Sequence, residues 1–244
     1  MPKSPRSGGR RAPWMDTVAS RMTPAIKALV IANTAVYLMY VFVKEIRPVM
    51  LEHLAVGEAM LHEPWQPITA LFVHFDPLSF VLNLVGLWFV GAFIERTQGT
   101  RRFLTLFFAA GILANVAIGL VASVYGARGV YAGTSGAVLA LFVAFARIYG
   151  PAPTQVLGTL YLKAHHLAMI FVGWAIVADL LRRDLASLAG TLVVTAVGYV
   201  LGAPGGLREA YDTFRARRLR QRYKVIDGGV PGRAKGARSH KYWN

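Results

Sequence analysis

The stretch Gly133-Thr134-Ser135-Gly136 decides how this chain is interpreted. It interrupts a very apolar sequence, and the segments on both sides are long enough to cross a bilayer. A serine between small residues at the start of an apolar helix has two interpretations. It is a nucleophile, or it is a small residue that lets two membrane helices pack closely.

The composition around this stretch indicates a polytopic membrane protein. The 244 residues are 55% hydrophobic, and the mean hydropathy is +0.44. The apolar residues gather in segments near the roughly 20 residues that span a bilayer. We predict six spans, over about 25–43, 68–94, 103–124, 133–148, 166–181 and 185–201, and expect Pro77 to bend or restart the second. The predicted fold class is an all-α membrane protein with a six-transmembrane-helix domain at 24–203, between basic tails at 1–23 and 204–244.

The distribution of charge predicts the topology. The formal net charge is +15, and 22 of the 27 Lys and Arg residues fall on one side if the N-terminus is inside. The positive-inside rule therefore predicts cytoplasmic termini, in a plasma or inner membrane. The basic C-terminal tail is expected to lie on the bilayer with anionic lipids as its partners, or to act only as a topology anchor. No nucleic-acid motif accompanies the charge, so nucleic acid is not a predicted partner.

Polar residues inside the spans predict a site near the outer surface. Ser79 and Asn83 are four residues apart and share one face of the second span, with His74 before them. Ser135 begins the fourth span, so these groups are expected at similar depth. The backbone N–H of Ser135 and the amide of Asn83 would form an oxyanion hole. The alternatives are an interhelical hydrogen bond for Asn83 and close helix packing for Ser135.

At these residues the chain resembles the rhomboid family of intramembrane serine proteases. The matches occur in the family's order. Its outer-loop motif is matched by Trp65-Gln66-Pro67-Ile68-Thr69 with Phe72 and His74, and its His-x-x-x-Asn motif by Asn83. Its glycine-to-glutamate turn is matched by Gly91, Glu95 and Gly99, its nucleophile motif by Gly133-Thr134-Ser135-Gly136, and the surroundings of its sixth-span histidine by Ala186, Leu188 and Gly190. The resemblance covers roughly residues 25–203 and implies a serine–histidine dyad with Ser135 as nucleophile.

The chain departs from the family where the chemistry is carried out. Ser187 stands at the position of the dyad histidine, which would take the proton of the nucleophile. Ser79 stands at the first position of the His-x-x-x-Asn motif, on the oxyanion side. Leu139 replaces a frequent aromatic residue, and Val194 replaces the second glycine of the sixth span. Several positions that serve the reaction therefore differ, whereas the fold motifs remain.

Two residues remain as alternative bases for Ser135. His74 matches a family histidine with a more structural role. Asp179 lies near the outer end of the fifth span, where an ion pair with Arg182 or Arg183 is the simpler interpretation. Three other candidates are expected at the opposite, cytoplasmic end of that span: Lys163, His165 and His166. Their side chains offer no useful metal-ligand spacing, and the chain has no cysteine, so we predict neither a metal nor a cofactor.

Two functions therefore stay open. The first is a non-catalytic rhomboid-like protein that binds the transmembrane segments of client proteins, because histidine is missing at both 79 and 187. The second is an intramembrane serine-type endopeptidase with nucleophile Ser135 and an unusual base. A transporter or channel has little support, because no span is rich enough in charge to line a path.

Overall fold

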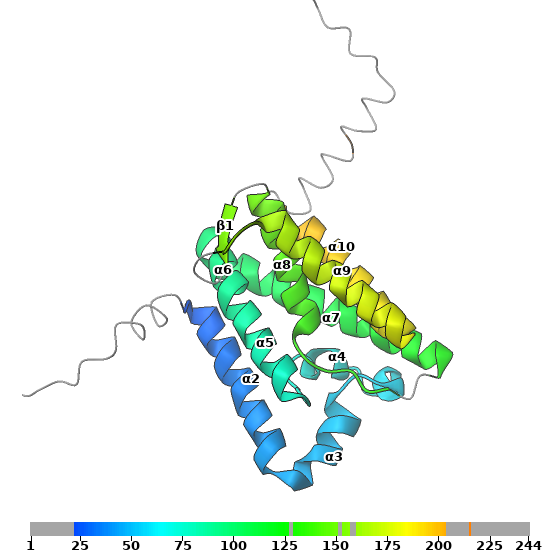
Figure 1. Cartoon of the computed structure of the whole chain (residues 1–244). Helices are drawn as coiled ribbons and strands as arrows, with labels where there is room; N and C mark the ends of the chain where they lie inside the picture. The colour runs from blue at the N-terminus through cyan, green and yellow to red at the C-terminus, as the bar shows by residue number, and fades with distance from the viewer. Residues whose placement is uncertain (1–21, 127–128, 151–152, 157–159, 204–214, 216–244) are drawn as a thin grey trace, which may run out of the picture.

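The computed structural model describes residues 22–126, 129–150, 153–156, 160–203 and 215 (Figure 1). Almost all of both predicted tails lies outside these residues. The longer helices are α2 (Pro24–Phe42), α5 (Pro77–Gly86), α7 (Thr100–Tyr125), α8 (Ser135–Tyr149), α9 (Ala164–Arg182) and α10 (Leu185–Leu201). The α5 helix continues through the π-helical turn η4 (Leu87–Gly91) into α6 (Ala92–Gln98). The described part is an all-α membrane fold, as the sequence predicts.

Six apolar helical segments match the six predicted spans. Four of them are long and apolar enough to cross a membrane by length and composition: Pro24–Phe42, Pro77–Gln98, Thr100–Tyr125 and Ala164–Arg182. The other two, α8 and α10, are apolar but shorter. The second span does not run unbroken from residue 68: a short helix covers Gln66–Thr69, residues 70–76 are not helical, and the helix restarts at Pro77, as we expected. That helix begins at Pro77, because a proline fits the first helical position and Asp76 accepts a hydrogen bond as N-cap.

The connections at the two ends of the bundle differ. The loop after α2 contains five short helices: η1 (Lys44–Ile46), α3 (Arg47–Val49), η2 (Met50–Leu54), η3 (Glu58–Leu61) and α4 (Gln66–Thr69). The link after α8 contains an antiparallel hairpin of β1 (Pro153–Val156) and β2 (Leu160–Lys163), which the sequence did not predict. Figure 1 shows α3 and α4 at one end of the helices and β1 at the other.

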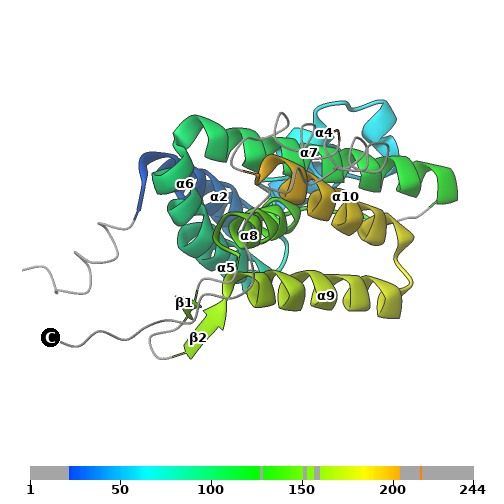
Figure 2. The ribbon, with the colours of Figure 1, turned by 90° about the horizontal axis from the view of Figure 1, so that it is seen from above.

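The helix α8 lies in the interior of the bundle (Figure 2). Eight of its residues are buried, from Ala137 to Phe145. The helix α10 approaches it closely through Gly198, where an added Cβ would lie 2.7 Å from the carbonyl oxygen of Ala140. Gly190 instead faces α7, where an added Cβ would meet Ile118 at 2.8 Å. Small residues therefore set the position of α10 against both neighbours.

Both ends of the helical domain lie at the same end of the bundle. The start of α2 is held by Glu95 of α6, which accepts backbone hydrogen bonds from Ala25 and Ile26, both at 3.2 Å. At the start of α7, Arg102 donates a hydrogen bond to the carbonyl oxygen of Ala203, just after α10. These contacts fit an even number of membrane crossings. Which side of the membrane this end faces stays a prediction.

Candidate functional site

The loop that carries Ser135 has a conformation that requires glycine. Gly133 has a φ of +113°, and its N–H donates to the carbonyl oxygen of Ala70 at 2.8 Å. An added Cβ would lie 3.6 Å from the ring of His74, so backbone strain rather than a clash excludes other residues. Thr134 is buried and precedes the first turn of α8. Ser135 is the first residue of α8, and it is exposed.

His74 holds this loop to the start of α5. It is only 2% exposed, and its Nε2 lies 3.4 Å from both the backbone N and the Oγ1 of Thr134. The same Nε2 lies 3.3 Å from Nδ2 of Asn83. A backbone N–H can only donate, so Nε2 accepts and Nδ1 carries the proton, directed at the carbonyl oxygen of Phe72 at 3.4 Å. His74, Asn83 and the serine loop therefore lie together, as we expected.

Asn83 faces the serine loop from α5. It is 8% exposed, and its Nδ2 lies 3.7 Å from the place where a Cβ of Gly133 would be. Its hydrogen bond to His74 joins α5 to the loop before the same helix, so it is not the interhelical bond that we gave as the alternative. An amide nitrogen has two N–H groups, so this bond leaves one for another acceptor. The oxyanion role of Asn83 stays a prediction.

Ser79 lies at the start of α5, and its main contact is a helix cap. Its backbone N–H donates to Oδ2 of Asp76 at 2.6 Å. That hydrogen bond is the main reason why the pKa of Asp76 lies below its usual range. Both residues are exposed. Ser79 is the third residue of its helix, in the sequence Asp76-Pro77-Leu78-Ser79.

Ser187 has the same place in α10. Its backbone N–H donates to Oδ1 of Asp184 at 3.0 Å, and Asp184 is the N-cap. The same oxygen accepts the hydroxyl of Tyr131 at 2.9 Å. Burial, together with this carboxylate, raises the pKa of Tyr131 to about 12. Within the described residues no hydrogen bond joins Ser135 to Ser187 or to His74.

The alternative base Asp179 has a partner that we did not predict. Its Oδ2 accepts the hydroxyl of Thr191 in α10 at 2.7 Å, and the residue is 8% exposed. It forms no ion pair with Arg182 or Arg183, both of which the structure describes, so that expectation was wrong. A hydroxyl from the neighbouring helix satisfies the buried carboxylate instead. Asp179 therefore joins α9 to α10.

The other polar candidates lie at the opposite end of α9. Lys163 is its N-cap, and His165 contacts the end of α8 through Nδ1, 3.0 Å from the carbonyl oxygen of Gly150. The rings of His165 and His166 are 4.2 Å apart. None of these three residues reaches the serine loop. In the described part of the chain no group of three His, Asp or Glu side chains is placed to hold a metal ion.

Apolar side chains fill the space behind the serine motif. Val194 is 1% exposed, and its Cγ1 would lie 3.3 Å from a Cβ added to Gly136. It packs with Ala110, Ala114 and Ala140, and Leu139 lies against the same cluster. The two residues that depart from the family pattern here therefore form part of the apolar packing.

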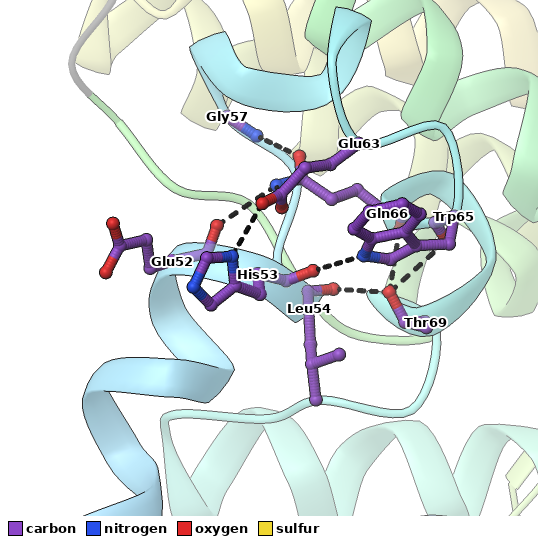
Figure 3. Close-up of polar contacts among 8 residues, drawn as sticks. All are labelled: Glu52, His53, Leu54, Gly57, Glu63, Trp65, Gln66 and Thr69. Atoms are coloured by element: carbon purple, nitrogen blue, oxygen red, sulfur yellow. Dashed lines mark hydrogen bonds and ion pairs between the residues drawn. The ribbon is translucent and has the colours of Figure 1, made fainter.

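The loop after α2 is fixed by a polar cluster around Gln66 (Figure 3). Gln66 is fully buried, and its Nε2 donates to Oε2 of Glu63 at 2.8 Å and to the carbonyl oxygen of Glu52 at 3.1 Å. Its Oε1 accepts the N–H of Gly57 at 3.3 Å. The other oxygen of Glu63 lies 2.6 Å from Nδ1 of His53. This hydrogen bond raises the pKa of His53 and lowers that of Glu63.

Comparison with known proteins identifies the family. Residues 61–206, more than half of the chain, match the Rhomboid domain. The chain belongs to the rhomboid family. It is 38% identical over 80 residues to the rhomboid protease GluP of Bacillus subtilis (strain 168), a match that covers 32% of this chain and 16% of GluP. It is 23% identical over 195 residues to the rhomboid protease GlpG of Salmonella choleraesuis (strain SC-B67), a match that covers 78% of this chain and 68% of GlpG. The match to the rhomboid protease GlpG of Salmonella typhi has the same identity and coverage.

As a rhomboid with six apolar helices, this chain is an integral membrane protein. Two residues beside Ser187, Tyr131 and Asp184, were not predicted from the sequence. A signal for one of them was present, because Asp184 precedes Ser187 by three residues, as Asp76 precedes Ser79. An acidic residue before an apolar helix is a common N-cap. The contact with Tyr131 had no local signal, because 53 residues separate it from Asp184.

Proposed function

We propose that this rhomboid is a non-catalytic member that binds transmembrane segments of client proteins. The observation that carries the proposal is the environment of Ser79 and Ser187. At both positions, where the family resemblance places histidines, a serine is the third residue of a helix, and its backbone N–H donates to an aspartate N-cap. A serine hydroxyl does not take up a proton at neutral pH, so neither residue activates Ser135.

The geometry of His74 supports the same proposal. A general base needs a free lone pair within hydrogen-bond distance of the proton it removes. The only lone pair of neutral His74 is on Nε2, which is directed at Thr134 and Asn83. His74 is therefore better placed to hold the loop than to deprotonate Ser135.

The exposure of the neighbouring helices supports a role in binding. Ser135 is exposed at the start of α8, and the helices around it present large apolar side chains outward. On α5 these are Leu78, Val81, Leu82 and Val85, and on α9 they are Trp174, Val177 and Leu181. A client helix would replace lipid on such a surface and gain van der Waals packing.

Labelling with a fluorophosphonate probe tests the catalytic part. We expect no labelling of the natural protein above that of Ser135→Ala, because the nucleophile has no base. A variant with Ser79→His and Ser187→His should gain labelling, since both changes keep the backbone N–H that caps each helix. Labelling of the natural protein that Ser135→Ala abolishes would make it a protease.

Site-specific photocrosslinking tests the binding part. A photoreactive residue at Val81 or Val177 should capture single-span membrane proteins in cells. The control position is Leu113 on α7, which is also 48% exposed but belongs to another helix. Equal capture from Val81, Val177 and Leu113 would mean that crosslinking reflects only random encounters with abundant membrane proteins. That result would reject client binding at α5 and α9.

A second candidate function is a protease with an unusual base. It is favoured by the exposure of Ser135 together with the position of Asn83, whose amide lies beside the serine loop. Such an enzyme would label with the probe and lose labelling in Asn83→Ala, because that change removes an oxyanion donor. The same experiment therefore separates the two candidates.

A further inference from the structure

A cavity of about 600 Å³ opens at the end of the bundle where the domain begins and ends. It lies between the end of α6, the first turns of α7 and the last residue of α10. Its lining combines polar and apolar side chains, among them Gln98, Arg101, Arg102, Thr105, Leu106 and Leu201. No acidic side chain lines it among the described residues.

The cavity lies at the surface of the membrane. Gln98 ends one candidate membrane span, and Thr100 begins the next. Leu106 is six residues further along α7, which is about 9 Å deeper at 1.5 Å per residue. Gln98, Arg101 and Arg102 therefore lie near the depth of lipid headgroups, and Leu106 lies toward the hydrocarbon.

The two arginines differ in how they are held. Arg102 donates through Nη1 to Oε1 of Gln98 at 2.7 Å and through Nη2 to the carbonyl oxygen of Ala203. These bonds fix its guanidinium at the cavity wall. Arg101 is exposed, and within the described residues its guanidinium makes no hydrogen bond or ion pair. The nearby carboxylate of Glu95 is already bound to Thr23, Thr100 and the first turn of α2.

We propose that this cavity binds the phosphate of an anionic phospholipid. A guanidinium presents paired N–H groups that match phosphate oxygens, so Arg101 would contact the phosphate beside the fixed Arg102. The glycerol and the first methylenes of the acyl chains would lie on Leu106 and Leu201. A free phosphate ion would contact only the polar residues of the cavity. Leu106 and Leu201 therefore favour a lipid as the ligand.

Native mass spectrometry of the full chain in detergent tests the proposal. The probes are dioctanoyl phosphatidylglycerol and dioctanoyl phosphatidylcholine. We expect Arg101→Gln to weaken the binding of phosphatidylglycerol about fivefold, the effect of about 1 kcal/mol for one arginine near an anionic surface. Arg101→Lys should lose less, because the charge remains. The matched control is Arg183→Gln, an exposed arginine at the opposite end of the bundle, which should change nothing.

Three results would overturn the proposal. The first is an equal loss in Arg101→Gln and Arg183→Gln, which would indicate general attraction between the basic chain and the lipid. The second is unchanged binding in Arg101→Gln, which would place the lipid elsewhere, for example on the basic tail. The third is binding of glycerol 3-phosphate as tight as that of phosphatidylglycerol, which would identify a site for soluble phosphates.

Discussion

Carboxylates hold helix N-termini at both ends of the bundle, but in different surroundings. At one end Glu95 is 4% exposed and accepts hydrogen bonds from both sides, from the start of α2 and from Thr100. At the other end Asp76 and Asp184 are N-caps of their own helices. Glu95 belongs to the family pattern that the chain keeps, whereas the two caps adjoin the positions where histidine is missing. The difference fits the proposal that the contacts joining the helices match the family pattern, whereas the residues that would carry out the reaction do not.

The largest loss of stability is expected when the buried carboxylate of Glu95 is removed. Glu95→Ala leaves the N–H groups of Ala25 and Ile26 and two threonine hydroxyls without their acceptor. We expect a loss of about 3 kcal/mol in the free energy of unfolding, because buried donors left unpaired are costly. Thermal unfolding in detergent measures it. The control is Thr97→Ala on the same helix, which is exposed and should change little. Similar losses in both variants would contradict a special role for Glu95.

The two N-cap aspartates should contribute different amounts to the stability of the protein. Asp184 holds both the N–H of Ser187 and the hydroxyl of Tyr131, and Asp76 holds only its own helix. We expect Asp184→Ala to cost about 2 kcal/mol, the sum of a lost cap and a lost tertiary hydrogen bond. Asp76→Ala should cost less, since Asp76 is exposed. Equal losses from the two changes would mean that the contact with Tyr131 adds no stability.

The contact with Tyr131 can be tested alone. Tyr131→Phe removes the hydroxyl and keeps the ring, so it should cost about 1 kcal/mol in the same unfolding measurement. Together with Asp184→Ala it completes a double-mutant cycle. If the hydroxyl acts only through Asp184, Tyr131→Phe should have almost no effect in the Asp184→Ala background. Additive losses would show that the two residues act independently.

The sequence predicted the helices better than the site. Hydropathy predicted six spans, and the predicted bounds of the sixth, about 185–201, are those of α10. The second span failed before Pro77, because the apolar composition continues through the short helix α4 and through residues 70–76, which are not helical. His74, Asn83 and the serine loop lie together as predicted, because they fall at the same end of their spans. The contacts of Tyr131 and Thr191 depend on how distant helices pack, which no local pattern encodes.

The smallest effect on stability is expected from the pair of His53 and Glu63 in the loop after α2. Its bond raises the pKa of His53 above 6.5 and lowers that of Glu63 below 4.5. A raised histidine pKa gives stability that is complete below 6.5 and is lost as the pH rises through the folded-state value. A lowered glutamate pKa gives stability that is present above 4.5 and is lost as the pH falls. The contribution of the pair should therefore be largest between these two values.

Unfolding temperatures between pH 5.5 and pH 9 measure this effect. The natural protein should lose a small part of its stability over this range relative to His53→Gln, which has no titrating group at this position. Because the side chain of His53 is exposed, added salt should reduce the difference between the two proteins. By contrast, the loss in Glu95→Ala should not depend on salt, because burial protects those hydrogen bonds from screening. Equal salt dependence of the two losses would mean that Glu95 acts as a surface charge, and would remove the distinction between the two ends of the bundle.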